Sequence, residues 1–314
     1  MAAQARGFFQ ELLLGYESTY GTSPASGSYV KVPFNSIGLG SDEEFIDSGT
    51  IDGNRFTVEP ILGNISVGGS ISVPVDVRNF PYWLKALFGT PTTSGSGPTY
   101  THVFYPQNDS VSMTLERGLT DISRYHLFNG CKINSFSFEF AKGQELVCNM
   151  EILGKGEVYG TTTIDGAPSA AVFQRFNAKQ VSVEEGGGVT TDVKDLTIDV
   201  SNDLDGDVYT LDGSGFRDSL PDTSFMVNGN YSALYKDSTF YTKMINNTET
   251  SLTVTTDDGT NSIVISIPEC KYPRKSPEDN AAGPIYLPVE FKAYKQDESD
   301  APLTITVVND VASY

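Results

Sequence analysis

The chain has 314 residues, of which 39% are hydrophobic, and its formal net charge is −19. With 30 glycines and 16 prolines, this composition fits a turn-rich globular protein of up to two domains and excludes a disordered chain. The acidic balance argues against nucleic-acid binding through phosphate contacts, and no apolar run approaches the length of a membrane span. The N-terminal residues lack a long apolar core and a cleavage site, so we expect no signal peptide.

Residues 1–28 are predicted to form an N-terminal arm. Apolar residues cluster within residues 8–14, and a stretch rich in serine, threonine, glycine and proline follows over residues 18–28. That composition is typical of a loop, which separates the apolar cluster from the rest of the chain. Further on, strict alternation of apolar residues over residues 64–75 predicts a strand with one buried face.

A helix is predicted over residues 79–88. Asn79 can act as its N-cap, Pro81 suits its first turn, and Gly89 suits the position after its last residue. The apolar side chains form one stripe, so we expect the helix to pack on the strands. The expected core anchors are Phe80, Trp83 and Leu87.

A β-hairpin is predicted over residues 129–155. Phenylalanines alternate with polar residues from Phe136 onward, and a turn containing Gly143 leads into a second alternating apolar series. Ile133 has the opposite parity to Phe136, which predicts a β-bulge near residues 134–135.

The three cysteines are Cys131, Cys148 and Cys270. Their odd number, their apolar strand contexts and the lack of C-x-x-C spacing predict buried free thiols rather than a disulfide or a metal site. Free thiols fit folding in a reducing cytoplasm.

The second half of the chain is expected to be a diverged copy of the first. Placing Cys131 on Cys270, which we call the cysteine alignment, brings residues 131–132 onto 270–271, both Cys-Lys, and residues 146–152 onto the alternating series 285–291. The phenylalanine strand does not survive this alignment, because lysine and proline stand at the corresponding positions. A short helix is expected within residues 235–246, matching the helix of the first half.

These patterns predict an all-β fold with two tandem β-sandwich or barrel domains, each flanked by a short helix. The expected boundaries are an N-terminal arm at residues 1–28, a first domain at 29–155, a linker at 156–168 and a second domain at 169–314.

No catalytic or cofactor motif is recognisable. The two histidines, His102 and His126, stand outside any metal or nucleophile motif. Residues 203–207 resemble the start of a calcium loop, but Val208 replaces the turn glycine. We therefore expect no catalytic residue, no cofactor and no metal, and a protein that is not an enzyme.

A basic cluster lies in the proline-broken segment after the last cysteine. It consists of Lys271, Arg274 and Lys275. It is either a solvated loop or a contact with an acidic neighbouring subunit.

Several stretches together point to a known family. They are residues 14–22 (LGYESTYGT), the run 63–74 followed by the helix 83–89, and the strand start 130–132 with its hairpin. In these features the chain resembles the tail tube proteins of long-tailed, non-contractile bacteriophages. The resemblance covers most of the first half, whereas in the second half it rests on the closing strands.

The resemblance implies a β-sandwich-like barrel whose subunits form rings, and rings that stack into a DNA-conducting tube. The chain would be a structural virion protein, the major tail tube subunit, with the tape measure and tail-end proteins as further partners. Genomic DNA would pass without specific binding, because acidic walls repel phosphate. The expected location is the virion tail, after assembly in the host cytoplasm and without a membrane anchor.

In such an assembly the apolar residues of the arm are expected to pack across a subunit or ring boundary rather than in their own core. These candidate inter-subunit residues are Phe8, Phe9, Leu12, Leu13 and Leu14.

Two domains per chain predict a ring of three chains with pseudo-sixfold symmetry. The competing arrangement is a hexamer in which residues 170–314 decorate the outside. Two other classes stay open: a carbohydrate-binding or carbohydrate-active β-sandwich protein, and an adhesin-like surface protein.

Overall fold

The computed structural model describes residues 4–51, 53–97, 99–141, 143–190, 192–278, 282–297 and 300–314. Strands dominate it, with two short α-helices between them, so the predicted all-β class is confirmed. The strands are β1 (Gln10–Tyr16), β2 (Val30–Lys31), β3 (Ser36–Ile37), β4 (Gly40–Ile46), β5 (Ile61–Pro74), β6 (Thr92–Gly95), β7 (Tyr100–Phe104), β8 (Met113–Leu119), β9 (Arg124–Ala141), β10 (Val147–Gly154), β11 (Gly156–Gly160), β12 (Ser169–Ala170), β13 (Val181–Glu185), β14 (Gly188–Thr190), β15 (Val193–Ser201), β16 (Met226–Leu234), β17 (Thr250–Asp257), β18 (Ser262–Lys271), β19 (Tyr286–Ala293) and β20 (Thr304–Asn309). The helices are α1 (Phe80–Phe88) and α2 (Thr239–Asn246), with single 3-10 turns at η1 (Gly7–Phe9), η2 (Thr120–Ile122) and η3 (Ala178–Gln180).

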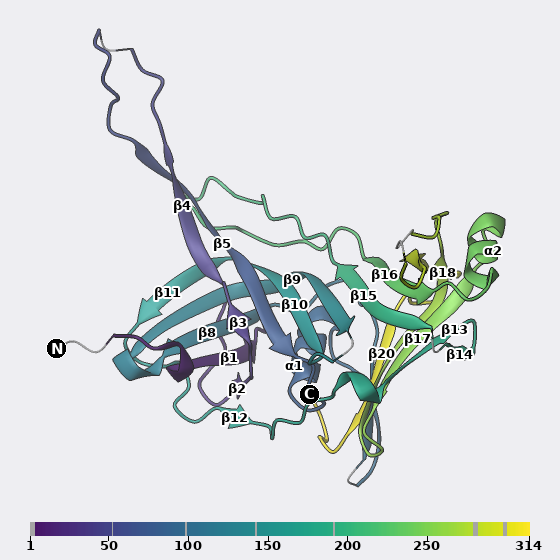
Figure 1. Cartoon of the computed structure of the whole chain (residues 1–314). Helices are drawn as coiled ribbons and strands as arrows, with labels where there is room; N and C mark the ends of the chain where they lie inside the picture. The colour runs from purple at the N-terminus through teal and green to yellow at the C-terminus, as the bar shows by residue number, and fades with distance from the viewer. Residues whose placement is uncertain are drawn as a thin grey trace.

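The long strand β9 belongs to both sheets of the molecule (Figure 1). Its first part pairs with β8 and β11, and its second part pairs with β10 and β15. Asn134 lies unpaired between the partners of Glu151 and Ile152, which confirms the predicted bulge. Gly143, in the turn to β10, has a φ of 77°, as its place in the hairpin predicts.

The first sheet runs in the order β2, β1, β8, β9, β11, with β12 parallel to β2. Two expected boundaries differ from this arrangement. Residues 10–16 of the predicted arm form β1, which pairs along its whole length with β8. The predicted linker at 156–168 begins with β11, which pairs with β9.

The second sheet continues through both halves of the chain. Its strands follow in the order β4, β5, β10, β9, β15, β16, β19, β18, β17, β13, β14, and β3 extends the edge at β4. β20 pairs with the other end of β18 and with β7, which carries β6. Since β15 pairs with β9 and β20 with β7, the two halves are joined by main-chain hydrogen bonds, and their buried side chains form one continuous core.

The N-terminus of helix α1 is capped by Asp76 and not by Asn79, the expected N-cap. Asn79 makes no side-chain capping bond. Instead, the buried Asp76 carboxylate accepts hydrogen bonds from the backbone N–H groups of Arg78 and Asn79. A carboxylate suits this place because the first N–H groups of a helix lack partners within the helix. Phe80, Trp83 and Leu87 are all buried in the core.

The two halves repeat their strand registers. Lys132 pairs with Leu153 between β9 and β10, and the cysteine alignment carries this pair onto the observed pair Lys271 and Lys292 between β18 and β19. A second bulge, at the start of the Cys-Lys segment, is also found in both halves. The β8–β9 register shifts between Met113 and Leu115, and the β17–β18 register shifts between Thr250 and Leu252.

Two strand glycines extend this correspondence to further strands. Gly69 on β5 lies opposite Ile152, and Gly229 on β16 lies opposite Phe291, which the cysteine alignment matches to Ile152. A Cβ atom on Gly69 would collide with the carbonyl oxygen of Gly38, between β3 and β4, and one on Gly229 with that of Thr197 on β15. β5 and β16 therefore correspond, with Gly69 matched to Gly229, and α2 follows β16 as α1 follows β5.

Candidate functional site

One face of the second sheet is polar across β5, β10, β9, β15, β16 and β19. Side chains alternate between the two sides of a strand, and the alternate residues here are buried in the core. The outward set, which we call the polar face, consists of Ser66, Ser70, Ser72, Ser137, Glu139, Asn149, Glu151, Thr197, Asp199, Ser201, Asn228, Asn230, Ser232, Glu290 and Lys292. It passes without interruption from the first half of the chain to the second, because β9 and β15 are paired.

The charge of the polar face is mainly negative. The set contains one basic residue, Lys292, and four acidic residues, Glu139, Glu151, Asp199 and Glu290. The Glu139 carboxylate accepts a hydrogen bond of 2.8 Å from the Asn149 amide, so it is held in place on the sheet. A shallow groove of about 300 Å³ between these strands is lined mainly by serine, asparagine and carboxylate side chains, together with Phe136, Met150 and Val200. Such a surface is well hydrated and offers a polyanion almost no cationic anchor.

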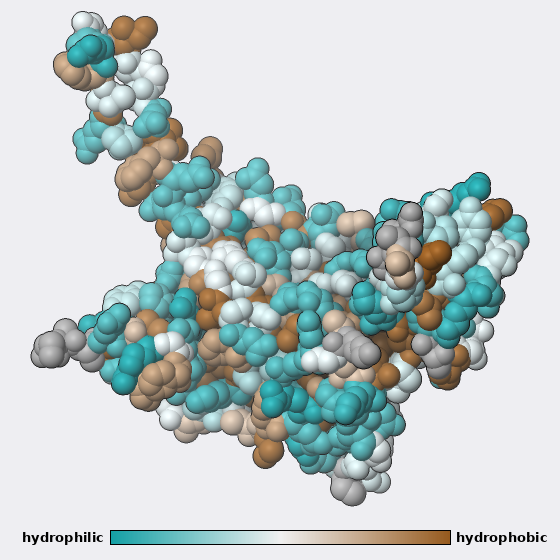
Figure 2. Space-filling view, viewed as in Figure 1, coloured by the Kyte–Doolittle hydropathy of each residue, from teal (hydrophilic) through white to brown (hydrophobic). Residues whose placement is uncertain are grey.

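An arm made of β4, β5 and their connecting loop projects from the body of the molecule (Figure 1). Apolar side chains are exposed along it, visible as brown patches among polar ones in Figure 2. They are Phe45, Ile46, Ile51, Phe56, Ile61 and Leu62. Exposed apolar surface of this kind is typical of protein–protein contact sites. The amino-acid sequence did not predict this projecting hairpin, although its apolar residues stand beside the acidic residues 42–44 of β4.

The segment between β15 and β16 occupies the corresponding place in the second half but lies against the body. The buried Arg217 fastens it, donating hydrogen bonds from Nη1 to the carbonyl oxygens of Val67 (2.6 Å) and Gly154 (2.8 Å). An ion pair of 2.8 Å between Lys132 and Asp222 adds a second attachment. Residues 202–225 therefore bind across the strands of the first half, as Figure 1 shows above β5.

The expected inter-subunit arm at the N-terminus is corrected in part. Leu12, Leu13 and Leu14 are buried within this chain, because β1 lies between β2 and β8. Leu12 and Leu14 belong to the core, and Leu13 lies on the opposite face of the strand. Phe8 and Phe9 are exposed, and the Arg6 guanidinium lies over both rings. These two rings alone of the five residues remain candidates for a contact between subunits.

Truncation separates these two parts of the N-terminus. Deleting residues 1–9 is expected to leave a folded protein, because the side chains of residues 4–9 are all exposed. Deleting residues 1–16 removes β1 and its buried leucines and is expected to give insoluble protein, since each lost leucine costs about 2–5 kcal/mol. Circular dichroism and thermal unfolding of both truncations test this. A soluble, cooperatively folded chain lacking residues 1–16 would show that β1 is dispensable.

The basic cluster lies at the end of β18. Lys271 lies over the Tyr294 ring, and Lys275 forms an exposed ion pair of 2.8 Å with Glu290. Arg274 is exposed and makes no hydrogen bond or ion pair with any described residue. The Arg274 guanidinium is thus presented to the outside of the molecule.

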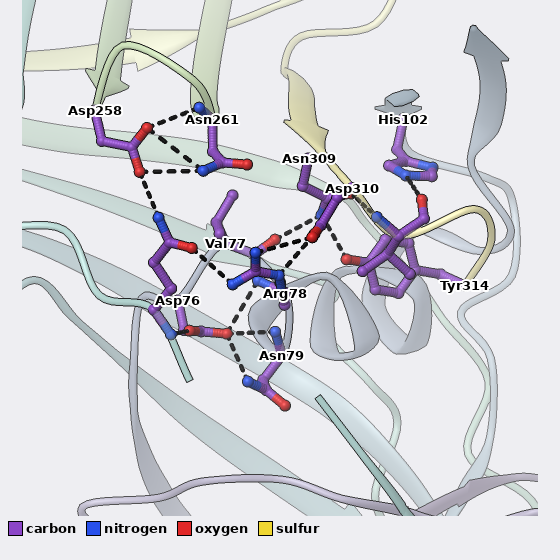
Figure 3. A network of polar contacts seen from close by, with 12 residues as sticks. Asp76, Val77, Arg78, Asn79, His102, Asp258, Asn261, Asn309, Asp310 and Tyr314 are labelled. Atoms are coloured by element: carbon purple, nitrogen blue, oxygen red, sulfur yellow. Dashed lines mark hydrogen bonds and ion pairs between the residues drawn. The ribbon is translucent and has the colours of Figure 1, made fainter. Parts of the chain in front are cut away.

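A polar network ties the C-terminal residues to the start of α1 (Figure 3). Arg78 forms an ion pair of 2.6 Å with Asp310, which lowers the pKa of that carboxyl group. The Asn309 amide donates to the carbonyl oxygen of Val77 (2.7 Å), and Tyr314 receives a second bond from the same amide. These contacts fix the chain end beside the helix, so the network is structural.

The histidines, the cysteines and the other metal-binding side chains of the described residues are dispersed or buried in the fold. No cluster of three metal-binding side chains is found among them. His102 is fully buried between Thr93 and the carbonyl oxygen of Val311, and burial lowers its pKa. The three cysteines are free and buried, as predicted, and burial raises the pKa of Cys270 to about 12, so this thiol is unreactive. No helix in the described part of the chain is long and apolar enough to cross a membrane.

Comparison with known proteins gives the family. A family model described as phage tail tube protein matches residues 10–293, which is most of the chain. The chain therefore belongs to the phage tail tube protein family. It is a structural tail tube protein, and its place is the virion tail. Membership of this structural family indicates a non-enzymatic protein. No curated protein matches the chain significantly.

Proposed function

We propose that this chain is the major tail tube subunit of a long-tailed phage with a non-contractile tail, and that its stacked rings form the channel through which DNA leaves the particle. The observation that carries the proposal is the polar face. It is broad, acidic and continuous through both halves of the chain. A channel wall of this kind keeps DNA hydrated and repels its phosphates, so DNA slides without specific binding.

The sheet that carries the polar face has to be closed by other copies. A barrel wide enough for duplex DNA needs more strands than this chain contributes, since barrel diameter grows with strand number. Joining sheet edges between copies would also cover edges that otherwise invite aggregation. The tape measure and tail-end proteins are the further partners we propose, with assembly in the host cytoplasm.

Electron microscopy of the purified protein tests this function. Rings or tubes with a central channel are the expected result. Monodisperse monomers that bind glycans, or a hydrolytic activity lost on changing one carboxylate, would contradict a purely structural role.

We further propose that three chains form each ring. The repeated registers give each chain two corresponding units, and the β9–β15 pairing joins them side by side. Six units in three chains give pseudo-sixfold symmetry, and alternate junctions are then within one chain, which lowers the association entropy that closure costs.

A cryo-EM reconstruction that counts chains per ring tests this stoichiometry. Three chains are expected, with β5, β10, β15 and β16 all in the channel wall. Six chains with residues 170–314 outside the wall would contradict it.

A further inference from the structure

The junction between the two halves within one chain shows how their sheets join. Residues 195–201 of β15 pair antiparallel with residues 135–141 of β9, so that Ser201 lies opposite Ser135 and Val200 opposite Phe136. One side of this junction is β15, the strand of the second half that borders the first half, and the other is the end of the long strand β9. Both of these strands have counterparts in the opposite half of the chain.

The counterpart of β15 is the edge formed by β3 and the start of β4. The carbonyl oxygen beside Gly229 belongs to Thr197, and the one beside Gly69 belongs to Gly38, so this edge corresponds to β15 with Gly38 matched to Thr197. Leu39 then matches Ile198, and both are buried. Among the described strands, β3 and β4 pair with β5 alone. Their other side is therefore an open sheet edge.

The counterpart of the end of β9 is the segment that follows β18. Lys271 pairs with Lys292, and Glu278 forms a bridge with Tyr286. The cysteine alignment relates this bridge to the pair Glu139 and Val147 in β9 and β10. Residues 272–278 therefore follow the path that β9 takes beside β10. No described strand lies on their outer side, where β15 lies on β9.

Charge complements these two open edges. When Gly38 is matched to Thr197, Asp42 occupies the position that corresponds to Ser201. The partner of Ser201 is Ser135, and Arg274 occupies the position that corresponds to it in the cysteine alignment. Both charged side chains are exposed, and neither forms a hydrogen bond or ion pair with the residues the structure describes. Opposite charges directly across an antiparallel pair stabilise it, whereas like charges destabilise it.

We propose that the open edge at residues 38–44 of one copy pairs with residues 272–278 of a second copy, in the register of β15 on β9, with Asp42 opposite Arg274 and Ser41 opposite Lys275. The partner is a second copy of this chain. The junction rests on the proposed ring, because a closed ring uses one edge of each kind from every chain. Pro273 and Pro277 cannot donate backbone hydrogen bonds, so the charge pair takes a larger part in holding this junction than it would in an unbroken ladder.

Charge reversal tests the register. Asp42→Arg and Arg274→Asp are each expected to reduce tube formation at least tenfold, measured by sedimentation and microscopy, with unchanged circular dichroism and thermal unfolding. The double variant Asp42→Arg/Arg274→Asp is expected to restore assembly. Lys179→Glu, which reverses another exposed charge outside the junction, is the matched control and should assemble normally. Single variants that assemble like the wild type, or a double variant that stays defective, would overturn the junction while wild-type tubes leave the proposed function intact.

A cross-link tests the junction without relying on tubes. Directly opposed residues of an antiparallel pair have Cα atoms about 4.5–5.5 Å apart, within the range of a disulfide. Ser41→Cys combined with Lys275→Cys is expected to give disulfide-linked multimers on oxidation of concentrated protein, and either variant alone should not. Absence of linked chains would overturn the junction, even if the wild type forms tubes. Linked chains without any tubes would support the junction and contradict the proposed function.

Discussion

Replacing Trp83 with alanine is expected to destabilise the fold by about 3–5 kcal/mol and to leave insoluble or unassembled protein. Trp83 is among the largest fully buried side chains of the molecule. Its helix packs on β9 through edge-to-face pairs of aromatic rings, with Phe80 5.4 Å from Phe138 and Phe88 6.1 Å from Phe136. An alanine would leave a large cavity beneath this helix, and that loss is a large share of the usual stability of a domain.

Trp83→Phe is the matched comparison, because phenylalanine keeps an apolar ring at the same place. It should lose clearly less stability than the alanine variant when both are followed by thermal or urea unfolding. Normal folding and normal tubes in Trp83→Ala would show that this side chain is not a core anchor.

Replacing Gly229 with alanine is expected to disrupt the sheet of the second half, at a cost of about 1–3 kcal/mol. The added methyl group would meet the carbonyl oxygen of Thr197 on one side and the ring of Phe291 on the other. Neither can yield freely, since Thr197 lies in a central strand and Phe291 is buried. β15 would have to move away from β16, and the polar face would lose its continuity.

Gly166→Ala provides the control for the Gly229 variant, because nothing lies within 4 Å of a Cβ atom at Gly166. Hydrogen exchange of the amides in β15 and β16 is the sharpest measurement, and faster exchange is expected there in Gly229→Ala alone. Unchanged protection would mean that the strands can absorb a methyl group at this position.

Local patterns in the sequence predicted the local structure well. The hairpin at Gly143, the bulge at Asn134, a helix near Trp83 and one within residues 235–246, and the buried free cysteines are all present. Each follows from residues close together in the chain, where periodicity and turn chemistry act directly. The strand registers at Lys132 and Lys271 also agree with the cysteine alignment, because the side-chain pattern of a strand reflects its register.

Contacts between distant segments could not be predicted in this way. The leucines of β1 were predicted to lie outside the core of their own chain, because a turn-rich loop follows them. In the structure β8, which is far along the chain, pairs with β1. The role of Arg217 could not be predicted, because three of its four hydrogen bonds go to backbone carbonyl groups, which carry no sequence signal. Asp76 took the capping role expected of Asn79 for a related reason, since both residue types can cap and geometry decides between them.

The difference between the β4–β5 arm and its counterpart bears on how rings would be oriented along a tail. In one half the hairpin stands free, whereas in the other Arg217 holds residues 202–225 against the body. A ring of three chains would then offer three free arms and three folded ones in alternation. The next ring could then stack on it in three equivalent orientations, each related by a rotation of a third of a turn. A rotation of a sixth of a turn would place each free arm where a folded segment belongs. This difference between the two hairpins would thereby limit the rotational freedom of the stack and give the tail a defined helical phase.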